Sequence, residues 1–212
     1  MIENIKSLVK SNRWLYWFLR GIRFKDEDEG YQAKLFEQHD LIKQKVFDLN
    51  PQTVLEIGCG FGRNIKFLIE DCKVAPEKIT GIDFSKTMLM NARKYLKEYL
   101  PKVELKNGSV LDIPFGENQF DLVLVHGVFM HIDPENLTQA IKETYRVCAK
   151  CVIQVEEFDF SKLNQKSNDY TFIHDYEKSY LSTISRDVLV TPLKSNPKLI
   201  FFELEKKSSI QF

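Results

Sequence analysis

The sequence predicts an α/β fold built on a doubly wound, mostly parallel sheet. Between residues 53 and 155, short apolar segments typical of buried strands alternate with segments of helical periodicity. This alternation is the signature of parallel strands joined by right-handed helical crossovers. Near the C-terminus, two apolar segments at 188–190 and 199–204 are too close for a helical crossover, so they are expected to pair antiparallel.

The elements are predicted from their periodicity and their end signals. Strands are expected at 53–57, 78–83, 103–106, 120–125 and 151–155, and helices at 31–49, 64–72, 85–100 and 134–147. Ser85 is suited to an N-cap, and Asp133 followed by Pro134 marks another helix start. After the fifth strand, residues 156–171 are expected to be irregular and residues 173–185 helical.

Composition favours one domain and argues against several classes of protein. The 212 residues are 43% hydrophobic, which is enough for one core but too little chain for two enzyme domains. The 30 basic and 30 acidic residues cancel, which disfavours a chain-wide basic surface for nucleic acid. Cys148 and Cys151 have no second pair of ligands nearby, so we expect no metal site. Without a signal-peptide pattern, the chain is predicted to be cytoplasmic.

The first 30 residues are expected to form a helical lid or cap, separate from a single domain at 31–212. Residues 14–19 contain both tryptophans and are flanked by basic side chains, while residues 25–30 resemble a solvated acidic linker. The apolar stretch is too short to span a membrane. We expect it to pack on its own domain or to cover a pocket, and the alternative is a helix lying on a membrane surface.

The strongest local motif is a glycine loop between the first predicted strand and the next helix. Residues 56–62 are Glu-Ile-Gly-Cys-Gly-Phe-Gly, and such glycines allow a tight turn and a close approach to a ligand. Asp83 ends the following strand, where a carboxylate can accept hydrogen bonds from ribose hydroxyls. A dinucleotide motif would have glycine where Arg63 stands, and the lysine of a phosphate-binding loop is absent. Because Glu56 also disfavours a pyrophosphate, the loop suits a nucleoside that lacks phosphates.

At this point the chain resembles the class I S-adenosylmethionine-dependent methyltransferases. The motifs that carry the resemblance are residues 56–62, 81–85, 107–115 and 120–123, followed by the stretch through 145–147. Together they cover roughly residues 50–158 in the family's order and spacing. The resemblance implies a Rossmann-like seven-stranded sheet, mostly parallel with a C-terminal antiparallel hairpin, and S-adenosyl-L-methionine as the cofactor.

The resemblance also implies a set of cofactor-binding residues. These are Glu56, Gly58, Cys59, Gly60 and Gly62 around the methionine portion, Asp83 at the ribose, Phe84 on the adenine face, Ser109 and Val110 at the adenine edge, and the backbone of His126 near the amino-acid end. The family often has aspartate where Ser109 stands, so either Ser109 or Asp112 would accept from the adenine amino group. The alternatives are that the glycines serve only helix–sheet packing, that Asp83 caps a helix and that Phe84 fills the core.

Three residues are candidates for a general base on the acceptor side. His131 follows the fourth strand, Glu156 follows the fifth, and His174 lies in a segment that would fold back over the site. An oxygen or nitrogen acceptor needs its proton removed, and each of these side chains has suitable chemistry. The alternatives are that His131 packs at the entry to a helix and that His174 caps one.

The sequence therefore predicts a methyltransferase acting on an oxygen or nitrogen of a small molecule. Residues 155–158 resemble those of methylases found with sugar biosynthesis, which favours a sugar-like acceptor. No nucleic-acid partner or membrane span is expected, and both a monomer and a homodimer fit. Two alternatives stay open. One is an RNA or protein methyltransferase that binds through its N-terminal Arg/Trp segment, and the other is a catalytically silent scaffold subunit that binds the cofactor.

Overall fold

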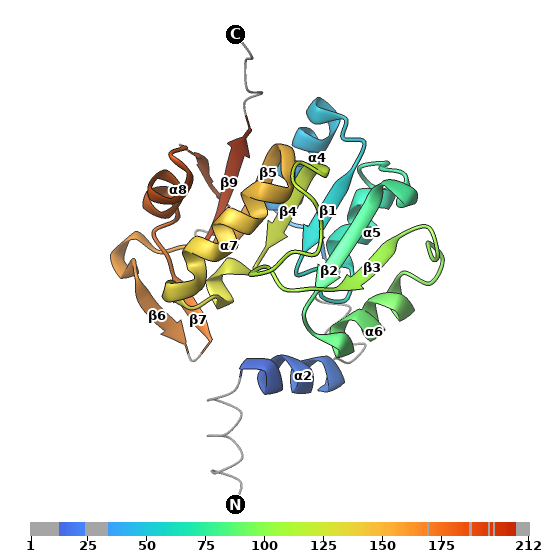
Figure 1. Ribbon diagram of the computed structural model, residues 1–212, viewed down its shortest axis with the longest axis horizontal. Coiled ribbons are helices and arrows are strands. Elements are labelled where there is room, and N and C mark those ends of the chain that lie inside the picture. Colours follow the sequence, from blue (N-terminus) through green and yellow to red (C-terminus); the bar gives the residue numbers. More distant parts are fainter. Residues whose placement is uncertain are drawn as a thin grey trace, which may run out of the picture.

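A seven-stranded sheet forms the centre of the protein in its computed structural model, which describes residues 13–23, 34–168, 170–186, 188–194, 196 and 198–206. The strand order is β3-β2-β1-β4-β5-β9-β8 (Figure 1). The strands are β1 (Val54–Ile57), β2 (Ile79–Asp83), β3 (Glu104–Asn107), β4 (Phe120–His126), β5 (Cys148–Glu157), β8 (Leu189–Pro192) and β9 (Leu199–Glu205). The first five are parallel, whereas β9 pairs antiparallel with both β5 and β8. The predicted fold class is confirmed.

Helices cover both faces of this sheet. The described helices are α2 (Arg13–Arg23), α4 (Glu37–Leu49), α5 (Arg63–Glu70), α6 (Lys86–Tyr95), α7 (Pro134–Val147) and α8 (Tyr176–Ile184). Side chains of α4, α5 and α6 share one buried cluster with Leu122 and Leu124 of β4. Those of α7 and α8 share the other with Val123 and Val125, which alternate with them along the same strand. Because β4 is buried on both faces, its residues 122–125 form a continuous apolar run rather than an alternating one.

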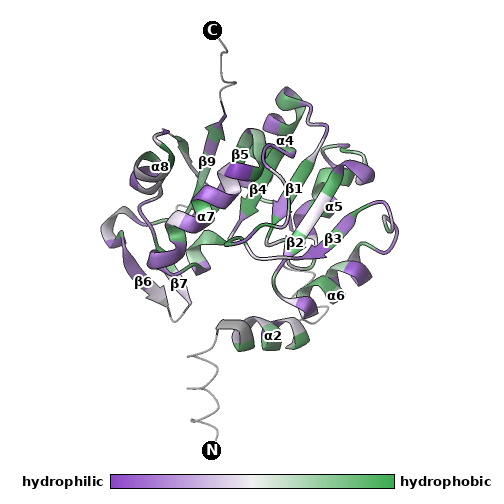
Figure 2. Cartoon of the chain, viewed as in Figure 1, coloured by the Kyte–Doolittle hydropathy of each residue, from purple (hydrophilic) through white to green (hydrophobic). Residues whose placement is uncertain are grey.

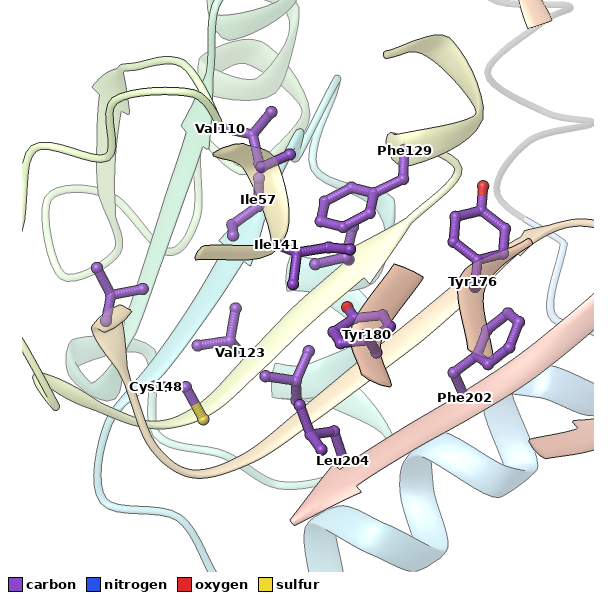
Figure 3. Packing of buried hydrophobic residues seen from close by; sticks show 14 of the residues in the cluster. Ile57, Val110, Val123, Phe129, Ile141, Cys148, Tyr176, Tyr180, Phe202 and Leu204 are labelled. Carbon is purple, nitrogen blue, oxygen red and sulfur yellow. The ribbon is translucent and has the colours of Figure 1, made fainter. Parts of the chain in front are cut away.

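The core on the α7 and α8 side is rich in aromatic rings (Figure 3). Tyr176 and Tyr180 of α8 both belong to this cluster, and Tyr176 lies next to Phe202 of β9. Tyr176 and Phe202 have ring centroids 5.1 Å apart, and the Tyr180 hydroxyl donates to Gln154 Oε1 at 2.7 Å. Helices α6 and α7 carry both hydrophilic and hydrophobic segments, as expected for helices with one buried face (Figure 2).

Helix α2 lies beside α6, at one end of the sheet (Figure 1). The Asn91 side chain donates from Nδ2 to the backbone oxygen of Gly21 at 2.9 Å, and Thr87 Oγ1 donates to that of Phe18 at 3.3 Å. A Cβ at Gly21 would lie only 2.2 Å from Thr87 Oγ1, so glycine is needed for this close approach. The remainder of the predicted cap, residues 1–12 and 24–30, lies outside the described residues.

The structure differs from the predicted elements mainly after β5. Residues 156–171 are not simply irregular, because β6 (Gln165–Asn168) pairs antiparallel with β7 (Thr171–Ile173). Strands of four and three residues are too short to show a clear alternation in the sequence. The predicted helix at 173–185 begins only at Tyr176, where Asp175 Oδ1 caps it by accepting from Lys178 N at 3.1 Å.

Two further helices are shorter than predicted. Helix α4 begins at Glu37, so residues 34–36 of the predicted helix lie before it, while residues 31–33 lie outside the described residues. Helix α6 ends at Tyr95 rather than near residue 100. Pro101 disfavours helical backbone at the residue before it, and the chain leaves the helix about one turn earlier. Short 3₁₀ segments occur at η1 (Pro76–Lys78), η2 (Phe129–His131) and η3 (Phe160–Lys162).

Candidate active site

A cavity of about 310 Å³ opens at the carboxyl ends of β1, β2 and β4. The chain leaves β1 toward β2 on one side and later returns to place β4 on the other, so the strand order reverses at this point. Ligands of open α/β sheets bind at such switch points. The cavity is lined by the β1–α5 loop, the end of β2, the loops after β3 and β4, and residues of α2.

The glycine loop presents bare backbone to this cavity at Gly58 and Gly60, whereas Gly62 is the N-cap of α5 and is not among the lining residues. Gly58, Gly60 and Gly62 have φ angles of 67°, 54° and 96°, a region that disfavours other residues. A Cβ at Gly58 would lie 2.4 Å from Val128, and one at Gly62 would lie 2.7 Å from Leu96. Nothing lies within 4 Å of a Cβ built at Gly60, so this glycine borders open space. The loop therefore needs glycine both for its own packing and for its conformation.

Cys59 lies within the same loop and is buried. Its backbone N–H donates to the oxygen of Ile82 at 2.9 Å, which ties the loop to β2. Burial, with the negative charges of Asp83 and Glu56, raises the pKa of the thiol well above its usual value. The side chain is therefore a neutral thiol in the cavity wall rather than a nucleophile.

Asp83 joins the glycine loop to the end of β2. Its Oδ2 accepts from Gly60 N at 2.9 Å and its Oδ1 accepts from Ser85 N at 2.8 Å. Burial raises the pKa of this carboxyl to about 6, against the effect of the two hydrogen bonds. Each carboxylate oxygen can accept a second hydrogen bond, and the side chain lines the cavity. The side-chain cap of α6 is Ser85, which accepts from Met88 N.

Glu56 is a buried carboxyl with one unpaired oxygen. Its Oε1 accepts from Asn64 Nδ2 at 2.7 Å, whereas the buried Oε2 has no hydrogen-bond partner among the described residues. Burial raises the pKa of Glu56 to about 8. An unpaired buried oxygen is costly, and Glu56 lines the cavity. A ligand that brings a cationic donor to Oε2 would remove that cost.

Arg63 and His126 lie next to this carboxyl. Arg63 begins α5, and its Nη2 is 3.1 Å from His126 Nδ1 at the end of β4. Burial and the Arg63 charge lower the pKa of His126 well below its usual value, so the neutral ring accepts a hydrogen bond from the guanidinium. His39 of α4 lies with its ring centroid 5.9 Å from that of His126, and burial lowers its pKa to about 4. The predicted contact of His126 was through its backbone, yet its side chain also lines this polar cluster.

Arg63 and Asn64 are site residues that sequence reasoning missed. From the sequence, Arg63 was used only as an argument against dinucleotide binding. Both residues nevertheless follow the glycine loop directly, at the start of a helix. That position was the available signal, because the first turn of such a helix faces whatever the loop binds.

The opposite end of the cavity is lined by Phe84, Met88, Ser109, Val110 and Leu111. Phe84 is a half-exposed side chain rather than a core residue, and Asn107 Nδ2 donates to its backbone oxygen at 2.9 Å. Ser109 Oγ accepts from Leu111 N at 3.1 Å. Asp112, the alternative polar partner in the prediction, is not among the lining residues.

His131 is the predicted base that reaches the cavity. It ends η2, and its Nδ1 lies 2.7 Å from the backbone oxygen of Tyr170. Because a carbonyl only accepts, Nδ1 carries the hydrogen and the lone pair of the neutral ring is on Nε2. Trp17 of α2 lies beside it, with ring centroids 4.9 Å apart, and Arg20 lines the same part of the cavity.

Glu156 and His174 are not brought to the cavity wall. The Glu156 carboxylate is fully buried and accepts from the backbone N–H groups of residues 128, 129 and 130 at 3.1, 2.8 and 3.0 Å. His174 Nε2 lies 3.1 Å from the oxygen of Phe129 and 3.0 Å from that of Ile132. Their predicted role as a base therefore has no geometric support. Both side chains instead hold the loop that presents His131.

Two features are absent from the ranges that the structure describes. No group of three or more His, Cys, Asp or Glu side chains there is arranged to hold a metal ion. Among the helices of those ranges, none has the length and apolar character needed to cross a membrane.

Comparison with known proteins finds methyltransferases. A family model for a methyltransferase domain matches residues 54–151. The chain is 34% identical over 147 residues to a demethylmenaquinone methyltransferase of Lactococcus lactis, an alignment that covers 67% of this chain and 57% of that protein. The chain spans about half the length of the curated relatives it matches.

Solved structures share the fold at low sequence identity. A candidate O-methyltransferase of Nostoc punctiforme aligns with a TM-score of 0.64 at 19% identity, over 80% of this chain and 56% of that chain. The methyltransferase domain of bacterial CtHen1 aligns with a TM-score of 0.62 at 18% identity, over 80% of this chain and 97% of that one.

Proposed function

Because the chain belongs to the class I S-adenosylmethionine-dependent methyltransferases, we propose that it transfers a methyl group from S-adenosylmethionine to an oxygen or nitrogen of a small molecule. The observation that carries the proposal is the buried, unpaired Oε2 of Glu56 beside the glycine loop. A carboxyl in this place suits an ammonium group and repels a pyrophosphate.

The cavity residues fit the parts of this cofactor. Glu56 would take the ammonium group, the backbone of residues 58–61 would lie along the methionine portion, and Asp83 would accept from the ribose hydroxyls. Gly62, which does not line the cavity, would contribute through the conformation of the loop. Phe84 would pack on the adenine, with Ser109 and Val110 at its edge and the backbone of His126 near the amino-acid end. When bound, the cofactor supplies an electrophilic methyl group on a sulfonium centre.

The chain's own contribution to transfer is alignment, exclusion of water and removal of a proton. His131 Nε2 would accept the proton of an acceptor hydroxyl as its oxygen forms the bond to the methyl carbon. We further propose that α2 acts as a lid, because Trp17 and Arg20 line the cavity and Tyr16 stacks on Tyr170 with ring centroids 4.2 Å apart.

A small acceptor is supported by the names of the curated relatives, which are demethylmenaquinone methyltransferases. A sugar-like acceptor has less support, because residues 155–158 do not line the cavity. The zero net charge gives no support to an RNA methyltransferase.

Calorimetry with the full chain tests the proposal. S-adenosylhomocysteine is expected to bind with micromolar affinity, about −8 kcal/mol, and NAD and ATP far more weakly. Transfer of labelled methyl groups from S-adenosylmethionine into a metabolite extract should yield a small labelled product. Tighter binding of NAD than of S-adenosylhomocysteine would overturn the cofactor assignment. Cofactor binding without labelled product from metabolites, RNA or protein would instead favour the scaffold alternative.

A further inference from the structure

One part of the cavity, which we call the acceptor half, has side chains that limit which class of methyl acceptor can bind. This inference rests on the proposed function. The lining residues that we assign to this half have no role in the proposed cofactor contacts; they are Trp17, Arg20, Val128, His131 and Ile132. They come from α2, which precedes the domain's first strand, and from the loop after β4.

The wall of this half is apolar and contains aromatic rings. The rings of Trp17 and His131 meet edge to face, with an interplanar angle of 71°. Val128 and Ile132 add aliphatic surface. Flat unsaturated rings pack well against such surfaces, because aromatic faces and edges attract one another and because a ring buries much apolar area. A sugar, with hydroxyls around its ring, would leave several of them without partners here.

The charge of this half is positive. Arg20 is exposed at the cavity, with its guanidinium carbon 5.8 Å from the centre of the Trp17 ring. Within the described residues it has no carboxylate ion-pair partner. The two carboxyls of the lining, Glu56 and Asp83, belong to the cofactor half. A guanidinium recognises carboxylates and other planar anions, and no described carboxylate competes for that of Arg20, so an anionic acceptor is favoured over an amine cation.

The proton-accepting group lies in the same half. The backbone oxygen of Tyr170 holds His131 Nδ1–H at 2.7 Å, which makes Nε2 the basic atom. Tyr170 is itself held by stacking on Tyr16 of α2. Tyr170, which lies between β6 and β7, therefore orients His131 and also contacts α2, the helix that carries Arg20.

We propose that the acceptor is a hydroxylated aromatic compound carrying a carboxylate or similar anion. Its ring packs against Trp17, its anion pairs with Arg20, and its hydroxyl faces His131. In the reaction the hydroxyl proton passes to His131 Nε2 and the oxygen–methyl bond forms. The methyl–sulfur bond of the bound cofactor breaks, and the products are a methyl ether and S-adenosylhomocysteine.

Binding and transfer are measured separately with defined probes on the full chain. The aromatic anions are 4-hydroxybenzoate and 6-hydroxy-2-naphthoate, which differ in ring size. Their methyl esters remove the charge, and methyl glucoside replaces the flat ring by a sugar. Calorimetry is done with and without S-adenosylhomocysteine. One of the two anions should bind at least tenfold more tightly than its ester and than the glucoside.

Arg20→Gln should reduce the affinity for the anion to that of its ester and leave the affinity for the ester unchanged. Arg186→Gln, which removes an arginine outside the cavity lining, is the matched control and should change neither. Unchanged anion affinity in Arg20→Gln, equal binding of the glucoside, or no binding of either anion would overturn the acceptor class. Charge-dependent binding without methyl transfer would retain this class and overturn the proposed function instead.

Discussion

The backbone N–H of Gly60 donates to Asp83 Oδ2 at 2.9 Å. The carboxylate proposed to hold the ribose therefore also fastens the glycine loop to the end of β2. Its second oxygen holds the N–H of Ser85, where α6 begins. Ligand binding and the conformation of the loop thus depend on one side chain.

Asp83→Ala is therefore expected to weaken binding and to reduce stability together. Affinity for S-adenosylhomocysteine should fall at least about tenfold, because hydrogen bonds to charged groups contribute ~1.5–3 kcal/mol each. The melting temperature of the ligand-free protein should also fall, since two backbone N–H groups lose their acceptor. Calorimetry and thermal unfolding measure the two effects. Asp112→Ala, at an exposed carboxylate outside the cavity lining, is the control and should change neither. Normal affinity in Asp83→Ala would refute the ribose assignment.

Glu56→Gln should change how stability depends on pH. Folding raises the pKa of Glu56 from 4.5 to about 8, so the unfolded chain releases this proton first. The stability associated with the protonated carboxyl is fully present below pH 4.5 and is lost as the pH rises toward 8. At ~1.4 kcal/mol per pH unit, wild type should lose about 3 kcal/mol relative to Glu56→Gln between pH 5 and 8.

Urea unfolding of both proteins without cofactor measures this difference. The other buried carboxyls with raised pKa values, Asp83 and Glu156, are common to both proteins, and their contributions cancel. Parallel stability profiles would show that Glu56 is already ionised in the ligand-free protein.

Cofactor binding should release a proton from Glu56. At pH 6.5 the carboxyl of the ligand-free protein is mostly protonated, whereas pairing with an ammonium group requires its charged form. Calorimetric titration with S-adenosylhomocysteine in buffers of different ionisation enthalpy should report close to one proton released. Glu56→Gln should bind more weakly and release none. Equal proton release by both proteins would assign the titration to another group.

His131→Gln should reduce methyl transfer with little effect on cofactor binding. Loss of a general base costs on the order of 10²–10⁴ in kcat, while the affinity for S-adenosylhomocysteine should stay within about threefold. Glu156→Gln is the contrasting variant, because a Gln side chain would place an N–H donor against the backbone N–H groups of residues 128–130. It should cost about 1–3 kcal/mol of stability and keep the pH profile of transfer. Loss of that pH profile in Glu156→Gln, but not in His131→Gln, would return the base to Glu156.

Deletion of residues 1–24 tests whether α2 is a lid. The truncated protein lacks Trp17 and Arg20 of the cavity wall, so methyl transfer should fall more than about tenfold through lost alignment and water exclusion. Cofactor affinity should change only a few fold, because these residues lie on the acceptor side. Sedimentation with anionic vesicles should be negligible for both proteins. Full transfer by the truncated chain, or clear vesicle binding by the intact one, would contradict the lid.

Much of the central sheet was predictable from the sequence, because buried strands require apolar residues. Apart from Glu56 and Asp121, residues 54–57 and 120–125 are apolar, since helices cover both faces of their strands. The glycine loop was recognisable because three alternate glycines follow an apolar strand segment, and all three have the positive φ angles that glycine permits. The β6–β7 hairpin was missed because its strands are too short for a periodic signal.

The sequence by itself determined the fold class, the glycine loop and the family, because these depend on local patterns of burial and backbone conformation. Only the tertiary structure decided which polar side chains face the cavity. Glu156 and His131 were equal candidates along the chain, but three backbone N–H groups occupy the Glu156 carboxylate, while Tyr170 orients His131 at the cavity wall. Which side chain faces the cavity depends on contacts between segments that are distant in the sequence, and no local sequence pattern encodes those contacts.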